Sequence, residues 1–355
     1  MLSDLRTLAR VLTDDLAPRT ATESVSISER PNARLIRYGS PDQLESARAR
    51  GAVPILLVPP LAVPAACYDL APNASPANSV VEFLLSTGTV PYVVDFGGVS
   101  WADRRLGFED YIDGIIPRAV AEVVDDFRSG ADAVDLMGWS LGGTLSLLTA
   151  GARRDLPIRS VITVGTPLNY QRIAPYPLVR ALLAPTDGRP VTYALRALGG
   201  IPSPLVRLAY RATAWEREVK KPKYILQNLD DVDALVRMQV IDRFQGSLPG
   251  YPGRVSEQML VNLIVRDEIA RGRLRFGDVD VDLTAVTAPV FMVGSHRDAI
   301  VSHAAAEHGR TLFTSSVHVE FHTVESSHLG LLTGADAEQA TWPAIAAFRE
   351  RIGRG

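Results

Sequence analysis

Near its middle the chain reads Val134-Asp135-Leu136-Met137-Gly138-Trp139-Ser140-Leu141-Gly142-Gly143-Thr144. The pattern is a short apolar strand, then Gly-x-Ser-x-Gly, then an apolar helix that we expect to continue to Ala150. Both flanking glycines suit a tight turn, because a side chain at either position would collide with neighbouring backbone. The sequence therefore predicts a strained strand-to-helix turn that presents the Ser140 hydroxyl as a nucleophile. The alternative is an ordinary strand–loop–helix joint whose serine only caps the helix.

Composition excludes several classes of protein. The chain has 355 residues, of which 46% are apolar and 22% charged, as in ordinary globular proteins. The formal net charge of −3 gives no reason to expect nucleic acid or an anionic membrane as a partner. The most apolar stretch, from Val53 to Cys67, contains four prolines and cannot form a membrane helix. With one cysteine, no signal-peptide core and no transmembrane segment, we expect a cytoplasmic protein.

Strand and helix patterns alternate through the first half of the chain. Expected strands cover about 25–28, 34–38, 54–58, 90–95, 134–137 and 158–164. Expected helices cover about 2–17, 78–85 with Asn78 as its cap, and 109–127 with a kink or restart at Pro117. This alternation predicts an α/β fold with a mostly parallel, doubly wound sheet that is covered on both faces.

After the sixth expected strand the pattern becomes helical. We therefore divide the chain into an α/β core, 1–166 and 283–355, and a helical cap or lid over the serine, 167–282. In the core we expect further strands at 289–294 and 317–323, and helices at 304–313 and 342–352. As a group, the apolar residues of the cap predict a roof suited to an acyl chain: Leu182, Leu183, Tyr193, Leu195, Leu205, Leu208, Tyr210, Trp215, Tyr224, Ile225 and Leu229.

A serine nucleophile needs a base to accept its proton and an acid to orient the base. Turns of this type use the chain order serine, acid, histidine, and all six histidines follow residue 295. We favour His328 as the base, because it follows an expected strand and has small neighbours. Surface or packing roles are favoured for His308, His318 and His322. A metal site at the last two is disfavoured, because four residues along a strand span about 13 Å.

The acid is predicted to be Asp298, in the loop after the expected strand at 289–294. Asp95 also ends a strand but precedes the serine, so we assign it a structural role. An oxyanion hole would combine the N–H of Leu141 with an N–H from the loop after the strand at 54–58. Leu61 is the favoured second donor and Ala62 is the alternative.

With these residues in place, the chain resembles the α/β-hydrolase superfamily and, within it, the polyhydroxyalkanoate (PHA) synthase family, especially the short two-component (class III-like) members. The likeness covers roughly residues 53 to 333. Its motifs are Val58-Pro59-Pro60, Tyr68-Asp69-Leu70, Val94-Asp95-Phe96-Gly97, Leu106-Gly107-Phe108-Glu109-Asp110-Tyr111, Gly138-Trp139-Ser140-Leu141-Gly142-Gly143, Val164-Gly165-Thr166-Pro167-Leu168, Gly272-Arg273-Leu274, Val281-Asp282-Leu283 and Ser327-His328-Leu329-Gly330. The resemblance implies transfer of hydroxyacyl groups from coenzyme A thioesters to a polyester, and a homodimer or a synthase-type partner subunit.

In that family the nucleophile, the aspartate and the histidine stand at the places of Ser140, Asp298 and His328, but the family nucleophile is a cysteine. An acyl-cysteine is a thioester, whereas an acyl-serine is an ordinary ester whose thermodynamically favoured acceptor is water. We therefore expect hydrolysis of acyl esters or thioesters. The alternatives are a synthase-like acyltransferase that uses hydroxyacyl-CoA, and a non-catalytic binding partner of a synthase or a lipid granule. Cys67 lies in a Pro/Ala loop and is expected to be a small buried residue.

We expect no cofactor and no metal, with a coenzyme A thioester as one candidate substrate. The cluster Lys220-Lys221-Pro222-Lys223 could meet a coenzyme A phosphate. We favour a solvated charged turn instead, because Glu216 and Glu218 lie close by in the chain.

Overall fold

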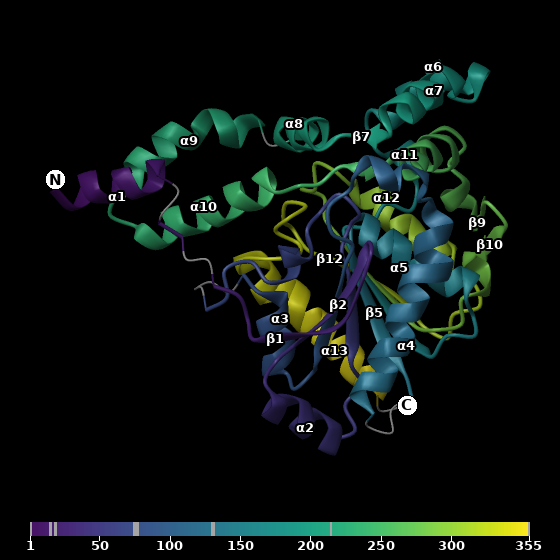
Figure 1. Ribbon diagram of the computed structural model, residues 1–355, viewed down its shortest axis with the longest axis horizontal. Coiled ribbons are helices and arrows are strands. Elements are labelled where there is room, and N and C mark those ends of the chain that lie inside the picture. Colours follow the sequence, from purple (N-terminus) through teal and green to yellow (C-terminus); the bar gives the residue numbers. More distant parts are fainter. Residues whose placement is uncertain are drawn as a thin grey trace.

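The computed structural model describes residues 2–13, 16–17, 20–73, 78–128, 132–213 and 215–353, without the side chains of 2–6, 213 and 215–218. At its centre is an eight-stranded sheet with the order β1-β2-β4-β3-β5-β6-β11-β12 (Figure 1). Its strands are β1 (Ser24–Arg30), β2 (Ala33–Tyr38), β3 (Ile55–Val58), β4 (Pro91–Asp95), β5 (Val134–Trp139), β6 (Ile158–Val164), β11 (Val290–Gly294) and β12 (Val319–Thr323).

The sheet is parallel from β4 to β12, and only β1 and β2 run antiparallel to their neighbours. The register pairs Val58 with Gly138 and Gly138 with Thr163. The carboxyl ends of β3, β5 and β6 are therefore level at the Gly-x-Ser-x-Gly turn. Loops at that edge meet beside Ser140, as expected for an open parallel sheet.

Alternate residues of the central strands belong to two different cores. In β3, Ile55 and Leu57 pack in the cluster that holds α3 (Val80–Ser86) and α13 (Trp342–Gly353). Leu56 and Val58 point the other way, into the cluster with α4 (Ile116–Phe127) and α5 (Leu141–Ala152). Because both faces are covered, the central strands carry apolar residues on both sides rather than on one side only. The predicted doubly wound α/β sheet is confirmed.

Asp135, inside β5, is a fully buried carboxylate that joins three elements. It accepts hydrogen bonds from Arg159 Nε (2.8 Å), Arg349 Nε (2.8 Å) and Ser160 Oγ (2.7 Å). Burial alone would raise the pKa of the Asp135 carboxyl, but the positive charges of Arg349 and Arg159 lower it overall. The network fixes the strand that carries Ser140 against β6 and α13.

We expect Asp135→Ala to lower the free energy of unfolding by about 3–5 kcal/mol, because it leaves two partly buried guanidinium groups without their fully buried anion. Since the folded pKa is lowered, this stabilisation is present above the unfolded-state pKa and is lost as the pH falls through the folded-state pKa. Urea unfolding at neutral and acidic pH would measure both effects. The exposed Asp125 of α4 provides the control, since Asp125→Asn should change stability by less than about 1 kcal/mol. Equal effects of the two variants would contradict the account.

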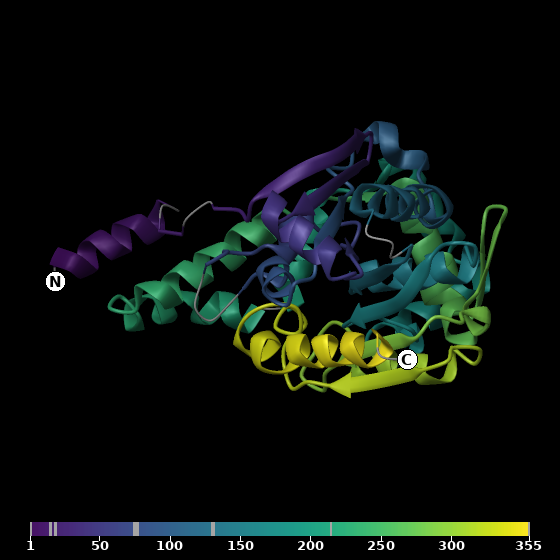
Figure 2. The ribbon, with the colours of Figure 1, turned by 90° about the horizontal axis from the view of Figure 1, so that it is seen from below.

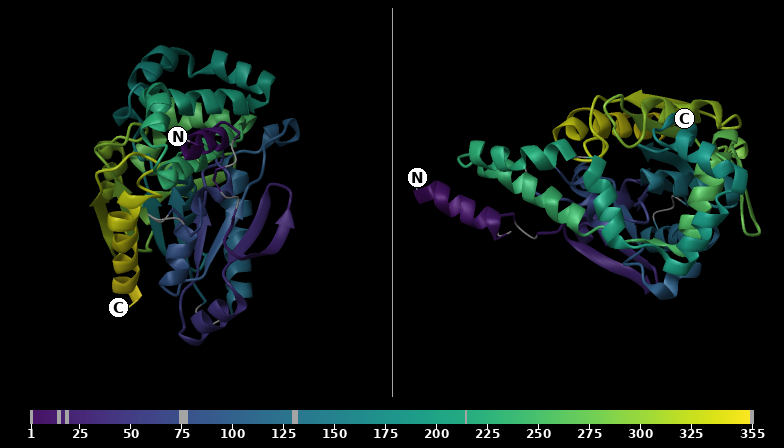
Figure 3. Two further views of the ribbon diagram at one scale, coloured as in Figure 1. Left: turned by 90° about the vertical axis from the view of Figure 1, so that its left-hand side faces the viewer. Right: turned by 90° about the horizontal axis from the view of Figure 1, so that it is seen from above.

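A helical insertion follows the sixth strand, as predicted. Its helices are α6 (Tyr176–Leu183), α7 (Arg189–Leu198), α8 (Ser203–Thr213), α9 (Trp215–Gln227), α10 (Val232–Gly246) and α11 (Gly253–Gln258). Figure 1 and Figure 3 show α6 to α9 above one end of the sheet, with α10 and α11 nearer to it. The hairpin of β9 (Arg273–Phe276) and β10 (Val279–Asp282) instead packs in the same core as α5. The predicted domain boundaries therefore stay a prediction.

Several local predictions were wrong. Helix α1 covers only Leu2–Leu12, because Leu16 and Ala17 donate their backbone N–H groups to Gln239 Oε1 of α10. Figure 2 shows α1 reaching away from the sheet beside the cap. Ser79 rather than Asn78 caps α3, since its hydroxyl accepts the Glu82 N–H at 3.0 Å.

Other elements differ in form. The predicted restart at Pro117 is confirmed, because Pro117, lacking an N–H, lies in the first turn of α4; the segment before it, Asp110–Ile115, is a π-helix. The expected helix at 304–313 divides into α12 (His303–Glu307) and a 3₁₀ turn. The lysine cluster is helical, within α9, rather than a turn. Helix α2 (Pro41–Ala49) was not predicted, although Ser40 and Gln43 form a capping box at its start. None of the described helices is long and apolar enough to cross a membrane.

The expected apolar roof is formed only in part. Leu183, Leu195, Tyr210, Ile225 and Leu229 are half-buried. Other members of the predicted set are exposed: Leu182, Tyr193, Leu205, Leu208 and Tyr224. The side chain of Trp215 lies outside the described residues. All five exposed residues lie on α6 to α9 and none lies on α10.

Candidate active site

Ser140 lies between β5 and α5 in a conformation that residues other than glycine rarely adopt, with φ 53° and ψ −126°. Its N–H donates to the Val164 carbonyl at 2.8 Å, and its own carbonyl accepts the Thr166 hydroxyl at 3.1 Å. Both partners belong to β6 or the loop after it, so neighbouring structure holds the strained residue in place. The predicted strained turn is confirmed.

The two flanking glycines are required by close backbone packing. A Cβ at Gly138 would collide with the carbonyl of Gly142, and a Cβ at Gly142 would collide with the carbonyl of Val58. Without side chains at either position, the first turn of α5 can press against the end of β3. This contact brings the N-terminus of α5, with its positive dipole end, close to Ser140.

Asp298 and His328 form a buried pair. His328 Nδ1 and Asp298 Oδ2 are 2.7 Å apart, and the two side chains are 6% and 0% exposed. The other carboxylate oxygen of Asp298 accepts the N–H groups of Ile300 (2.8 Å) and Val301 (2.9 Å). With one oxygen held by backbone and the other by the ring, the carboxylate can fix the orientation and tautomer of the imidazole.

Ser140 and His328 share two neighbours. Trp139 Nε1 donates to the His328 carbonyl at 3.2 Å, and the Trp139 ring centroid lies 5.1 Å from that of the imidazole. The ring also lies against the end of β6, since a Cβ at Gly165 would be 3.1 Å from His328 Cε1. Among the described residues, the Ser140 hydroxyl makes no hydrogen bond to His328. Such contacts are often long in a site without substrate and shorten when it binds.

A single hydroxyl connects the two loops that carry the pair. Ser295 Oγ donates to the Ser326 carbonyl (2.6 Å) and accepts the N–H groups of Ser326 (3.1 Å) and Arg297 (2.9 Å). Ser295 is fully buried three residues before Asp298, and Ser326 is buried two residues before His328. Ser295 is therefore a positioning residue for the Asp298–His328 distance. It was missed because nothing in the sequence around it indicates this contact.

We expect Ser295→Ala to lower kcat by about tenfold with little change in KM, because a loosened pair orients the base less well without touching substrate. The pH profile of kcat/KM should also shift, which a purely structural loss would not cause. Ser295→Thr, which keeps the hydroxyl, should recover most of the activity. If Ser295→Ala changes stability alone, or if Ser295→Thr is equally impaired, the positioning role is contradicted.

The proposed oxyanion donors lie at the predicted places. Leu141 begins α5, and Leu61 is buried in the turn after β3. Neither N–H donates to another described residue, and the same holds for Ala62. The buried Tyr68 hydroxyl donates to the Val58 carbonyl (2.7 Å) and accepts the Trp139 N–H (3.1 Å). Burial raises the pKa of Tyr68, so a neutral hydroxyl joins this turn to the Ser140 turn.

The residues that we set aside lie in other settings. Asp95 accepts the Gly97 N–H and pairs with Arg34, in a structural role as predicted. His308 starts a 3₁₀ turn, where its Nε2 lies 2.8 Å from the Ala270 carbonyl. His318 precedes β12 and His322 lies within it. Cys67 is fully buried, as expected. Within the described residues, no group of three or more His, Cys, Asp or Glu side chains could hold a metal ion.

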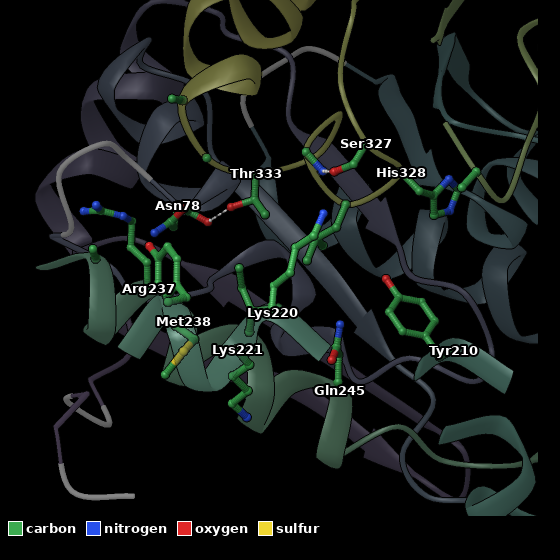
Figure 4. A pocket seen from close by; sticks show the side chains of 18 of the residues that line it. Asn78, Tyr210, Lys220, Lys221, Arg237, Met238, Gln245, Ser327, His328 and Thr333 are labelled. Carbon is green, nitrogen blue, oxygen red and sulfur yellow. Dashed lines mark hydrogen bonds between the residues drawn. The ribbon is translucent and has the colours of Figure 1, made fainter. Parts of the chain in front are cut away.

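A cavity of about 750 Å³ opens beside the imidazole. Its walls come from α8, α9 and α10 of the cap and from the loops after β11 and β12, which carry Ala299 and His328. Figure 4 shows Tyr210 and His328 on one side of this cavity and Met238 and Arg237 on the other. Lys220 and Lys221 also line it, and Lys221 pairs with Asp242 at 2.7 Å. Ser140 is half-buried and is not among the lining residues.

Comparisons with known proteins give relatives by sequence and by fold. No family model matches the chain. The poly(3-hydroxyalkanoate) polymerase subunit PhaC of Allochromatium vinosum is 26% identical over 313 residues, covering 88% of this chain and 83% of the relative. PhaC of Thiocystis violacea is 24% identical over 270 residues, covering 76% and 73%. This chain is similar to PHA polymerase subunits.

Solved structures show the fold. The esterase RhEst1 from Rhodococcus sp. has a TM-score of 0.50 at 16% identity, covering 94% of this chain and 99% of that one. The monoacylglycerol lipase of Paleococcus ferrophilus has a TM-score of 0.51 at 15% identity, covering 90% and 99%. With its mostly parallel sheet and flanking helices, the chain has the α/β-hydrolase fold. It is an enzyme with the α/β-hydrolase fold.

Proposed function

We propose that this enzyme hydrolyses acyl esters or thioesters through an acyl-serine intermediate. The observation that carries the proposal is the buried Asp298–His328 pair, with its 2.7 Å contact, next to a serine held at φ 53°. A histidine that is buried with one ring nitrogen against an aspartate leaves the other nitrogen to exchange protons. A serine on a strained turn has its hydroxyl exposed for attack. A binding module would need neither feature.

In the proposed reaction, Ser140 Oγ attacks the acyl carbonyl carbon while its proton passes to His328 Nε2. The negative charge on the carbonyl oxygen is accepted by the N–H groups of Leu141 and Leu61. The tetrahedral intermediate then collapses, breaking the bond to the alcohol or thiol, which leaves with the proton from His328. A water molecule repeats the sequence on the acyl-serine, releasing the acid and restoring the serine. Asp298 stays ionised and holds the imidazole.

The cavity supports an acyl group as the part of the substrate that is recognised. Its volume of about 750 Å³ lies within the roughly 300–1,000 Å³ that is usual for small-ligand sites. Its lining includes Ala234, Met238, Ile241, Ile300 and Leu329. Apolar side chains of this kind bury hydrocarbon but give little discrimination between chains that differ by one methylene.

The second candidate is a synthase-like acyltransferase that uses a hydroxyacyl-CoA. The sequence likeness to PhaC polymerase subunits favours it. Lys220 and Lys221 at the cavity add cations that could meet a phosphate of coenzyme A. We place it second because a serine ester gains almost nothing by passing its acyl group to another alcohol, whereas water is abundant and drives the reaction forward. A homodimer or a partner subunit would accompany this second function.

Product analysis distinguishes these functions. We expect purified enzyme to release p-nitrophenol and free acid from p-nitrophenyl esters, and to convert 3-hydroxyacyl-CoA into free acid and coenzyme A without polymer. Reverse-phase chromatography and a polymer precipitation assay would measure both outcomes. Polymer, or acyl transfer to an added alcohol in preference to water, would contradict hydrolysis and support the transferase. The absence of turnover with either substrate would leave only a binding role.

A further inference from the structure

The outer helices of the cap expose large apolar side chains. Leu178, Leu182 and Leu208 are 63%, 70% and 64% exposed, although leucine is among the residue types most often buried. We call the exposed apolar side chains on α6 to α9 the cap face: Leu178, Leu182, Val191, Tyr193, Leu198, Leu205, Leu208, Val219, Tyr224 and Leu226. Large apolar side chains that gather on the exposed side of one layer are typical of an interaction site.

Part of the cap face follows helical periodicity. Leu178 and Leu182 are four residues apart on α6, Leu205 and Leu208 three apart on α8, and Val219 and Leu226 seven apart on α9. Residues at these spacings lie on the same side of a helix. Figure 1 and Figure 3 show α6 to α9 as the outermost layer of the molecule, with α10 and α11 between them and the sheet. Within the described part of the chain, no element lies outside this layer.

The same helices are basic although the chain as a whole is slightly acidic. Residues 176–227 contain nine Arg or Lys and three Asp or Glu, whereas the whole chain has 37 and 40. Exposed basic residues lie beside members of the cap face on the same helices. Arg189 is four residues before Tyr193, and Lys223 is four residues after Val219. Arg211 likewise follows Leu208 by three. The net charge of −3 therefore conceals a local positive surface. We expected no anionic membrane partner because that expectation used the charge of the whole chain and not the charge of these helices.

We propose that the cap face docks on an anionic phospholipid surface. Apolar side chains inserted among the acyl chains, with basic residues at the headgroups beside them, are the arrangement by which amphipathic helices bind such a surface. Long Arg and Lys side chains can reach the headgroups while their stems stay apolar. A second copy fits less well, because pairing two such faces would bring like charges together. Helices α8 and α9 also line the cavity, so docking brings the cavity beside the lipid.

Vesicle flotation of the full chain tests the proposal. We expect the enzyme to bind vesicles of equal parts phosphatidylcholine and phosphatidylglycerol at about 0.1 M salt, and to be largely released at about 1 M salt. Binding to phosphatidylcholine alone should be at least about tenfold weaker. The double variant Leu182→Ser with Leu208→Ser should lose about tenfold or more of the binding, since two buried leucines are removed from the lipid. Arg211→Gln with Lys223→Gln should remove the preference for anionic vesicles.

Two matched controls lie outside the cap. Val317 is 78% exposed before β12, and Arg128 is exposed after α4, so Val317→Ser and Arg128→Gln should bind as the parent does. The changed residues are exposed, and unaltered thermal unfolding of each variant would verify folding. Equal binding to neutral vesicles, equal loss in the controls, or no binding at all would overturn the proposal. So would a dimer in sedimentation that the leucine variants dissociate while vesicles stay unbound. Because flotation needs no turnover, failure of the proposed hydrolysis would be seen separately.

Discussion

Ser140→Ala is expected to lower kcat/KM for p-nitrophenyl ester hydrolysis by roughly 10⁴- to 10⁶-fold, because no other group can form the acyl-enzyme. The cavity and the oxyanion donors stay in place, so a small residual rate over water should persist. Substrate binding should change little, since the serine is not among the cavity-lining residues. Steady-state kinetics with an active-site titration of the parent enzyme would measure the loss.

The matched control is Ser86→Ala, which removes an exposed hydroxyl that bonds only within its own helix. It should leave kcat/KM unchanged. If Ser140→Ala keeps more than about a hundredth of the activity, Ser140 is not the nucleophile.

Ser140→Cys probes the choice of acceptor. A thiol at this place would form a thioester intermediate, in which an acyl group is as activated as in acyl-CoA. We expect this variant to accept acyl-CoA and to pass more of the acyl group to an added alcohol than the parent enzyme does. The ratio of transferred product to free acid is the measurement. An unchanged ratio would show that the pocket, rather than the nucleophile, determines the acceptor.

The second large effect is expected at the acid–base pair. His328→Ala should lower kcat/KM by roughly 10⁴- to 10⁶-fold, since the serine then has no base. Asp298→Asn should lower kcat/KM by roughly 10³- to 10⁴-fold. The amide keeps the shape of the buried carboxylate, but it lacks the negative charge and no longer fixes the tautomer of His328. Combining His328→Ala with Ser140→Ala should add little, since the residues act as one unit.

Asp95→Asn is the matched control for the acid, because Asp95 also ends a parallel strand but pairs with Arg34 away from the serine. It should retain nearly full activity. A loss at Asp95 equal to that at Asp298 would mean that the wrong carboxylate has been assigned. If the loss of activity in the double variant equals the product of the losses in the two single variants, His328 and Ser140 act independently.

The sheet and the serine turn could be predicted because local chemistry specifies them. Strands buried on both faces are mainly apolar. β3 is apolar throughout, and β5 and β6 are apolar outside the Asp135 network and Thr163. The turn requires glycine at 138 and 142 for steric reasons that the sequence displays directly. The pair of Asp298 and His328 followed from chain order and from loops at the carboxyl ends of strands. These features depend on neighbours in sequence or on topology that allows few alternatives.

The features that were missed depend on contacts between distant segments. Ser295 acquires its role only when the loops after β11 and β12 lie side by side. Helix α1 ends early because Gln239, more than two hundred residues away, accepts the N–H groups that would continue it. The apolar residues of the cap were predicted to form a roof over the serine. Helical periodicity cannot distinguish a buried face of a helix from an exposed one. The total charge likewise carried no information about the charge of α6 to α9.

Covalent labelling with a fluorophosphonate tests the central claim most directly, because this reagent is attacked only by a serine that a neighbouring base activates. Intact mass spectrometry and peptide mapping should find one phosphonyl group per chain, on Ser140. Labelling should fall sharply in His328→Ala and to a smaller extent in Asp298→Asn. An unlabelled enzyme, a group on another serine, or full labelling of Ser140 without His328 would contradict the arrangement of nucleophile, base and acid described above.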